Sequence, residues 1–447
     1  MTSAAPPTES APLVPGAPAP LPAPPSAPPG RVPRGLAALR HRNFRYYWFG
    51  QIVSLVGTWM QQVSQPWLVL LLGGSAIQLG IVLALQYLPA LFFAPLGGVL
   101  ADRFDKRRVL MATQSVALLQ AVTLTVLAAT GLVQIWHLML LSLTLGIVNA
   151  ADMPVRQSFA AELVPRPDLM NAIALNSTSF NGARVMGPAV AGITLAIYGP
   201  AVNFGINAVS YLAVLLALWR MDPAAITRPP RPEHWASVRS SLAEGIRYAL
   251  HTPTVLWPLV LLGGMSVFAM NFQTLLPLFA RYTLRLNADG YGLLFAAMGA
   301  GSLIGSLFLA FSARRRLLLR LILGGAAGFV AFEVALGLSR TPLAVYPIIG
   351  ALGLVSMLMV NSINVMVQNN VPDALRGRVM SLYVTVFAGS APIGGFLAAT
   401  VAQLWGAPAG FLLGAAVASL VVILVAWQLL VLGKAWTDTA APTVAAG

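Results

Sequence analysis

The sequence predicts an all-α membrane protein with twelve transmembrane helices arranged as two six-helix pseudo-repeats. Three observations lead to this fold class: few charged residues, apolar runs long enough to cross a bilayer, and positive charges confined to alternate connections. Of the 447 residues, 57% are hydrophobic and 9% are charged. A soluble domain carries about 25% charged residues, so the bilayer must accept most of this surface.

Apolar runs of about 20 residues recur along the chain, and this length crosses about 30 Å of hydrocarbon. Gly and Pro within several runs are compatible with membrane helices, where neighbouring helices satisfy the freed backbone groups. The twelve predicted spans cover residues 46–70, 78–101, 109–129, 135–153, 172–198, 201–219, 255–282, 289–312, 319–338, 343–366, 379–403 and 408–431.

Lys and Arg are concentrated in one alternate set of connections. That set and the terminal arms hold 23 of the 27 cationic residues. The opposite set holds Arg281, Arg285 and Arg340, while Arg184 lies inside the fifth span. Positive residues are retained in the cytoplasm, so we expect both termini and the central connection to be cytoplasmic. This orientation requires an even number of spans.

An internal repeat is visible at an offset of 207 residues. A Val-Pro pair follows both the fourth and the tenth span, at 164–165 and 371–372, and Arg pairs at 107–108 and 314–315 show the same offset. Parallel repeats with a substrate site at their interface are a recurring transporter architecture. We therefore divide the chain into a disordered Pro/Ala-rich cytoplasmic tail (1–40), an N-terminal six-helix half (41–220), a cytoplasmic central loop (221–253), a C-terminal six-helix half (254–432) and a cytoplasmic tail (433–447).

The second connection carries Asp102 followed by a cluster of cations. A carboxylate there can accept hydrogen bonds from a helix N-terminus, and the cations can pair with carboxylates or lipid phosphates. A positive-inside loop with one stray acid is the alternative. The string resembles the loop motif of the major facilitator superfamily, although it has Asp105 where many members have Gly. The resemblance implies a conformational latch, for the N-terminal half only, formed by Gly98, Asp102, Arg103 and Arg107.

The fifth span contains an arginine at a depth where charge is costly. Ser177, Asn181, Arg184 and Pro188 share one helical stripe, so we expect the stripe to face the bundle. The alternative is a purely structural role, in which the Arg184 guanidinium donates hydrogen bonds to carbonyls at a helix end. The span also resembles the superfamily's antiporter motif, which implies export. The matching residues are Ala183, Gly187, Pro188 and Gly192, with Ala183 in place of a usual glycine.

Uncharged polar residues form stripes on the first and tenth spans. Such stripes either line a cavity or bond helices to one another, and the sequence leaves both interpretations open. With the two polar residues of the fifth span, the cavity-lining candidates are Gln51, Thr58, Gln62, Gln65, Ser177, Asn181, Asn361, Asn364 and Gln368.

Two acids lie near or within the hydrocarbon, Asp152 at the cytoplasmic end of the fourth span and Glu333 inside the ninth. A proton-coupled carrier needs a carboxylate that changes protonation, so Asp152, Glu333 and the cation Arg184 are candidates for proton coupling. A salt bridge with Arg156 is the alternative for Asp152, and a protonated, inert side chain is the alternative for Glu333.

The residues around Asp152 and the stretch Trp59–Val63 resemble one branch of the superfamily, the exporters similar to the enterobactin exporter and the macrolide efflux pumps. The resemblance covers about residues 40–430 and implies drug or siderophore export by proton antiport. The branch's wider motifs place an arginine in the middle of the fourth span, and residues 138–148 contain none.

The leading hypothesis is a secondary active transporter that exports a small amphipathic molecule, a drug or siderophore, by alternating access in exchange for protons. We expect a monomer in a bacterial inner membrane, with the substrate, protons and the lipid bilayer as partners. Nucleic acid, metals and cofactors are not expected, because the cations are dispersed and the four His residues are scattered. The chain is not expected to be an enzyme. A membrane-embedded enzyme and a non-coupled facilitator are the alternatives.

The distribution of Lys and Arg predicts on which side of the membrane each connection lies, and this can be tested. Reporters fused after Gly447 and inserted at Gly199 should report the cytoplasm and the opposite side, respectively. Alkaline phosphatase and green fluorescent protein fusions measure this directly. A cytoplasmic signal from the Gly199 insertion would overturn the orientation.

Overall fold

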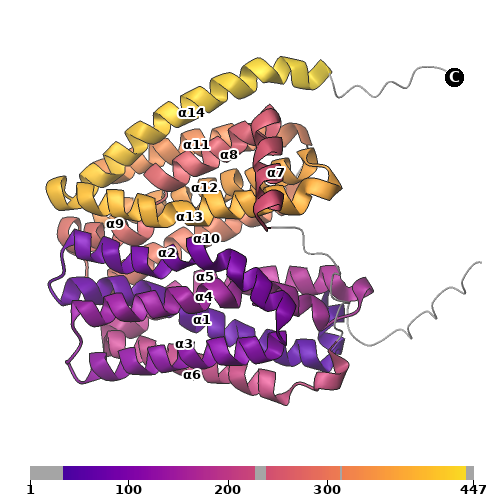
Figure 1. Cartoon of the computed structure of the whole chain (residues 1–447). Helices are drawn as coiled ribbons and strands as arrows, with labels where there is room; N and C mark the ends of the chain where they lie inside the picture. Colours follow the sequence, from indigo (N-terminus) through magenta and orange to yellow (C-terminus); the bar gives the residue numbers. More distant parts are fainter. Residues whose placement is uncertain (1–33, 227–237, 313–314, 439–447) are drawn as a thin grey trace, which may run out of the picture.

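The computed structural model describes residues 34–226, 238–312 and 315–438, and within them every regular element is a helix (Figure 1). We name the first six long helices the N-terminal bundle. They are α1 (Arg42–Leu71), α2 (Ala76–Arg103), α3 (Lys106–Ala129), α4 (Ile135–Glu162), α5 (Leu169–Tyr198) and α6 (Pro200–Arg220).

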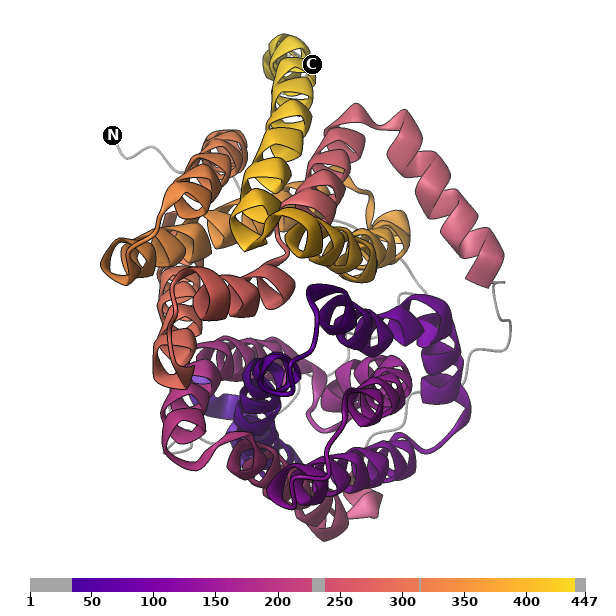
Figure 2. The same cartoon turned by 90° about the vertical axis from the view of Figure 1, so that its left-hand side faces the viewer.

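The helices that follow the central connection form the C-terminal bundle. They are α8 (Pro253–Phe268), α9 (Phe272–Leu278), α10 (Ala288–Ser312), α11 (Arg315–Leu338), α12 (Pro342–Asn370), α13 (Asp373–Trp405) and α14 (Ala407–Asp438). Figure 2 shows the two bundles side by side when the molecule is viewed along its helices.

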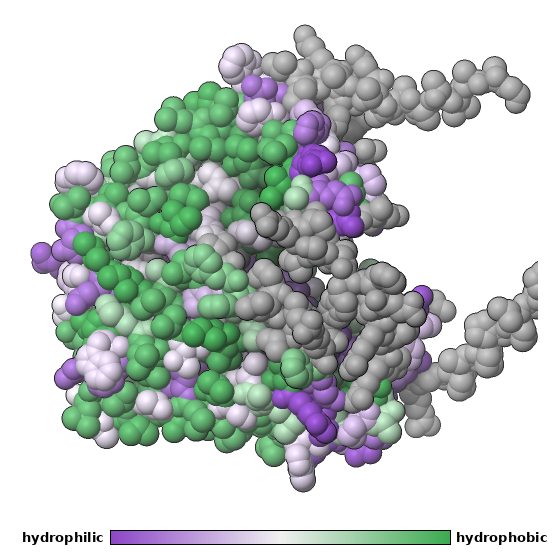
Figure 3. All heavy atoms as spheres, viewed as in Figure 1, coloured by the Kyte–Doolittle hydropathy of each residue, from purple (hydrophilic) through white to green (hydrophobic). Residues whose placement is uncertain are grey.

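Ten segments of the described residues are long and apolar enough to cross a membrane, which confirms an all-helical membrane protein. The helix α1 is not among them, and α2 is counted as a shorter apolar helix over Ala76–Pro89. Apolar residues dominate the visible flank of the molecule in Figure 3, whereas hydrophilic residues gather toward its ends. The number of crossings stays a prediction.

One predicted boundary is wrong, and one predicted span is interrupted. The fourth span was expected to end at residue 153, but α4 continues to Glu162, so Asp152 lies within the helix. The seventh span is not one continuous helix, because α8 ends at Phe268 and α9 begins at Phe272. At this break the Asn271 side chain donates from Nδ2 to the Val267 carbonyl at 2.8 Å, which satisfies one of the carbonyls freed at the helix end.

Two segments expected to lack structure are partly helical. Residues Arg34–Arg40, placed in the disordered tail, form a 3₁₀ helix in which Ala38 N donates to Asn171 Oδ1 at 2.8 Å. The predicted central loop contains the helix α7 (Val238–His251). Tertiary contacts with α5 and α13 stabilise these segments, and such contacts are not visible in composition alone.

The bundles meet mainly near one end, which we call the distal end: it contains the α1–α2 and α13–α14 connections and is opposite the described chain ends (Figure 1). Here α2 packs on α13 and α5 packs on α10. Both crossings use small residues. A Cβ on Gly80 would lie 2.6 Å from Ala399 Cβ, and one on Gly192 would lie 2.5 Å from Gly292 Cα. Small residues let membrane helices approach at backbone distance.

The α5–α10 crossing predicts a selective effect of side-chain size. Gly192→Val should lower the stability of the folded protein by about 1–3 kcal/mol, because the new side chain overlaps the Gly292 backbone. Gly182→Val, on the same helix with open space around its α-carbon, is the matched control and should change stability little. Thermal unfolding followed by size-exclusion chromatography in detergent measures both. Equal behaviour of the two variants would contradict the close crossing.

Candidate functional site

Asp152 is the most fully hydrogen-bonded of the candidate acids. Its Oδ1 accepts hydrogen bonds from Thr113 Oγ1 at 2.6 Å and from Gln114 Nε2 at 2.9 Å, both on α3. Its Oδ2 accepts one from Arg156 Nε at 2.6 Å. Three donors, one of them cationic, therefore surround a buried carboxylate. This arrangement corresponds to the salt-bridge alternative and joins α3 to α4.

Arg184 lies where the two bundles meet. Its Nη1 donates to Met357 Sδ on α12 at 3.4 Å, and a thioether is a weak acceptor. Its backbone is also close to α10, since a Cβ on Gly299 would lie 3.1 Å from the Arg184 carbonyl oxygen. No carboxylate among the described residues pairs with this guanidinium. Neither Asp152 nor Glu333 balances its charge in this conformation.

Glu333 is enclosed within the C-terminal bundle. It is 0% exposed, and neither carboxyl oxygen has a hydrogen-bond partner among the residues that the structure describes. The α14 backbone is close, because a Cβ on Gly414 would lie 3.4 Å from Oε1. One turn earlier on α11, Phe329 packs against Phe272 at a centroid distance of 5.8 Å. A negative charge in this apolar site would have no compensating partner.

The predicted latch is described only in part. The side chains of Gly98, Asp102 and Arg103 lie outside the described residues. Arg107 donates from Nε to the Leu218 carbonyl at 2.6 Å and so joins the start of α3 to the end of α6. These contacts stay within the N-terminal bundle, so Arg107 itself does not bridge the bundles here. The latch role of the four residues stays a prediction.

The fifth-span motif residues pack closely. Ala183, Gly187 and Pro188 are buried, as is Gly192 at the α5–α10 crossing. A Cβ on Gly187 would lie 2.4 Å from Trp59 Cβ on α1. The small residues therefore allow α5 to approach α1 on one side and α10 on the other. On the shared stripe, Ser177 is exposed and Asn181 donates to the Ser177 carbonyl at 2.9 Å.

The polar stripe on the first span includes a residue that is hydrogen-bonded to other helices. Gln65 belongs to a buried network: its Nε2 donates to Ser142 Oγ at 2.5 Å, and Gln61 donates to Gln65 Oε1 at 3.4 Å. Asn207 Nδ2 donates to Gln61 Oε1 at 2.7 Å, and Gln61 also reaches Gln120 at 3.5 Å. Helices α1, α3, α4 and α6 meet in this network. The geometry favours the interhelical role for Gln65.

Most residues of this network are not among the predicted candidates. Gln61 belongs to the same polar run as the predicted Gln62 and lies at the edge of the predicted stripe, one turn from Gln65. Asn203 on α6 donates from Nδ2 to Ser64 Oγ at 2.6 Å and to the Ala191 carbonyl at 3.0 Å. The sequence does contain an indication of a polar contact on this helix, because Asn203 and Asn207 are one helical turn apart within an apolar run.

The other polar candidates differ in their partners. Gln51 is buried with Oε1 unpaired among the described residues, and Thr58 donates to the Ser54 carbonyl at 2.8 Å. Gln62 accepts a long 3.4 Å hydrogen bond from Gln273 of the C-terminal bundle. On α12 the contacts are Asn361 Nδ2 to Ser306 Oγ at 3.2 Å and Gln368 Nε2 to Asn364 Oδ1 at 2.6 Å.

Aromatic and polar contacts close the distal end between the bundles. Trp67 stacks on Tyr291 with ring centroids 4.8 Å apart, and the Arg281 guanidinium lies over the Trp67 ring at 5.7 Å. Tyr87 Oη donates to Gln273 Oε1 at 3.0 Å. A cation over an indole face contributes about 0.5–2 kcal/mol. These contacts hold α1 and α2 against α9 and α10.

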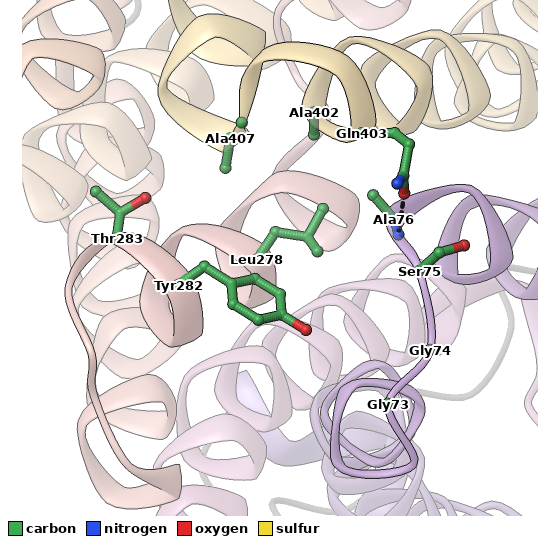
Figure 4. Close-up of a pocket in the computed structure, with 11 residues that line it drawn as sticks. Gly73, Gly74, Ser75, Ala76, Leu278, Tyr282, Thr283, Ala402, Gln403 and Ala407 are labelled. Atoms are coloured by element: carbon green, nitrogen blue, oxygen red, sulfur yellow. Dashed lines mark hydrogen bonds between the residues drawn. The ribbon is translucent and has the colours of Figure 1, made fainter.

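A cavity of about 460 Å³ lies at the distal end, shown in Figure 4. Its lining comes from the α1–α2 connection, from α9 and the π-helical turn after it (Phe279–Thr283), and from the α13–α14 connection. The lining residues are uncharged, and Ala76 N donates to Gln403 Oε1 across it at 3.0 Å. None of the predicted cavity-lining residues lines this cavity, so it is distinct from the predicted substrate path.

Comparison with protein families gives one match over most of the chain. A family described as transmembrane secretion effector matches residues 34–442. Among curated proteins, the staphyloferrin A transporter of Staphylococcus aureus is 27% identical over 368 residues, covering 81% of this chain and 90% of that protein. The enterobactin exporter of Escherichia coli is 28% identical over 347 residues, covering 77% and 81%.

Solved structures of similar fold are transporters with low sequence identity. The peptide-transporter-family protein PepTSo superposes with a TM-score of 0.71 at 13% identity, covering 88% of this chain and 99% of that one. A bacterial homologue of the lysosomal transporter Spinster gives 0.64 at 15% identity, covering 90% and 97%. These similarities show the fold.

The Asp152–Arg156 pair predicts a double-mutant pattern. Asp152→Ala should destabilise the protein by about 3–5 kcal/mol, because it leaves the Arg156 charge without its anion. Asp152→Ala combined with Arg156→Met should recover part of that loss. Thermal unfolding in detergent measures the series, with Asp222→Ala, on an exposed turn, as the control. A double variant no more stable than the single would show that the pairing is not the cause.

Proposed function

The chain belongs to the transmembrane secretion effector family of the major facilitator superfamily, and from this we propose that it exports a small amphipathic molecule, a siderophore or a drug. It is a multi-pass membrane transporter. The observation that carries the export proposal is its similarity, over about four fifths of its length, to a staphyloferrin A transporter and an enterobactin exporter. The bacterial relatives support a location in the inner membrane.

We propose twelve spans in two repeats, because the helix contacts recur in both bundles. The pairs α2·α4 and α3·α6 correspond to α10·α12 and α11·α14, and the crossing α2·α13 corresponds to α5·α10. Two glycines with positive φ, Gly199 at 75° and Gly406 at 85°, make the turns after α5 and α13. Their positions differ by the same 207 residues as the sequence repeat.

Alternating access between the two bundles is supported by where the described contacts lie. The stacked Trp67–Tyr291 pair and the Ala76–Gln403 hydrogen bond both join the bundles at the distal end. With the predicted topology, that end faces away from the cytoplasm. We propose that this conformation is closed on the outside and that opening the distal contacts releases the exported molecule.

Proton exchange is proposed to use Arg184 with one of the two intramembrane acids. Arg184 touches α12 and α10 across the bundle interface, so its environment changes if the bundles reorient. Among the described residues its guanidinium has a thioether as its hydrogen-bond partner, which leaves capacity for an anion in another state. Asp152 is held by three donors, whereas Glu333 has none among the residues that the structure describes, so the two acids would respond differently to reorientation.

The export proposal is tested by deletion of the gene under iron limitation. We expect the siderophore to accumulate in the cells and to fall several-fold in the medium, with restoration by the intact gene. A parallel drug-susceptibility screen tests the second substrate class. If neither siderophore secretion nor drug tolerance changes, the proposed export is wrong.

The coupling proposal is tested separately in proteoliposomes. Arg184→Gln should lose at least ten-fold in gradient-driven transport per folded molecule, because it removes the charge while keeping hydrogen-bonding capacity, and Arg184→Lys should retain part of the activity. Rates are measured with and without an imposed pH gradient. A gradient-independent wild-type rate would indicate a facilitator, and a gradient-driven Arg184→Gln at the wild-type rate would exclude this arginine.

A further inference from the structure

The helix α7 (Val238–His251) lies outside both bundles and crosses the direction of the spans. Figure 1 shows it running across the neighbouring helices, and Figure 2 shows it at the edge of the molecule in the plane perpendicular to them. Its level is defined by two contacts. Tyr248 Oη donates to the carbonyl of Asn370, the last residue of α12, at 3.0 Å, and Arg378 in the first turns of α13 forms an ion pair with Glu244.

One face of α7 is bound to the start of α13. Gly245 and Ala249 are buried, and they lie one helical turn apart. A Cβ on Gly245 would lie 3.1 Å from the Arg378 carbonyl oxygen, so the two backbones nearly touch. This close contact, the ion pair and the tyrosine hydrogen bond hold α7 to the C-terminal bundle.

A second face of α7 is apolar and uncovered by the described residues. Ile246 is 38% exposed and Leu250 is 58% exposed, and Ala243 lies on the same side at helical spacing. We call these three residues the α7 apolar strip. Arg247 and His251 are exposed on the flank of this strip, on the side away from Gly245 and Ala249. The helix is therefore amphipathic, with half of its apolar arc buried on α13 and half open.

We propose that α7 is an interfacial helix, with its apolar strip inserted at the boundary between headgroups and acyl chains and with Arg247 among the lipid phosphates. An amphipathic helix with cations on its polar face lies in the membrane plane in this manner. The occupant is lipid, not another protein, because α7 lies perpendicular to the spans and level with the end of α12 and the start of α13. At this level a membrane surface surrounds the bundle.

The insertion would anchor the start of α13 to one leaflet. Because α13 also packs on α2 across the bundle interface, the α7 contact connects lipid to a helix that must move if the bundles reorient. A cation at this level, such as Arg247, is attracted to the phosphates of anionic headgroups. The inference depends on the membrane location and not on the substrate or coupling.

The chain has no cysteine, so single labels can be placed without background. Leu250→Cys and His251→Cys are labelled separately with a thiol-reactive fluorophore and reconstituted into vesicles of phosphatidylethanolamine and phosphatidylglycerol. We expect the label at 250 to be quenched at least three-fold more by brominated acyl chains than by iodide, and the label at 251 to show the reverse. Leu420→Cys on α14, at a position that is 68% exposed in the middle of a span, gives the lipid-facing reference.

Two outcomes would overturn the proposal. Equal iodide quenching at positions 250 and 251 would show that the strip is not inserted. The second outcome concerns quenching of the label at position 250 by brominated acyl chains. If this quenching is the same in zwitterionic and phosphatidylglycerol-containing vesicles, or the same with and without Arg247→Gln, the headgroup contact is rejected. All four substituted positions, 247, 250, 251 and 420, are exposed, so the folded bundle is preserved, and a monodisperse elution profile verifies this for each variant.

Discussion

Polar groups in hydrocarbon have no water to bind, so each must find its partner within the protein. This constraint organises the N-terminal bundle. Gln61 and Gln65 on α1 reach α3, α4 and α6 through hydrogen bonds of 2.5–3.5 Å, and Asp152 takes three donors from α3 and α4. Because five of these seven bonds join different helices, satisfying the polar groups also sets how the helices are packed.

The C-terminal bundle meets the same constraint differently. Its core is built from apolar contacts around rings such as Phe272 and Phe411, with centroids 6.1 Å apart, and its buried acid Glu333 has no hydrogen-bond partner among the described residues. The two bundles thus share a pattern of helix contacts but not the chemistry of their interiors. Asp152 is hydrogen-bonded, whereas Glu333 has no hydrogen-bond partner among the described residues. The two acids therefore offer different chemistry.

Small residues determine where the bundles can touch. The Gly192–Gly292 and Gly80–Ala399 approaches bring backbones together near the distal end, and Trp67 on Tyr291 covers the neighbouring interface. Contacts of this kind depend on shape and have few strong hydrogen bonds, so they can separate and re-form at modest cost. The proposed reorientation of the two bundles would require this property.

The sequence by itself determined the membrane class, the helix positions to within a few residues for most spans, and the residue types available for chemistry, because hydrocarbon thickness and the distribution of cations act on composition alone. Only the tertiary structure decided which partners those residues have. It paired Asp152 with Arg156, gave Arg184 a methionine in place of an acid, and directed Gln65 into an interhelical network. It also folded α7 within the predicted central loop and broke the helix after Phe268. The Asp152–Arg156 pair is local, at i,i+4, and was one of the alternatives open from the sequence. The partners of Arg184 and Gln65 depend instead on contacts between residues far apart in the chain, which local periodicity does not specify.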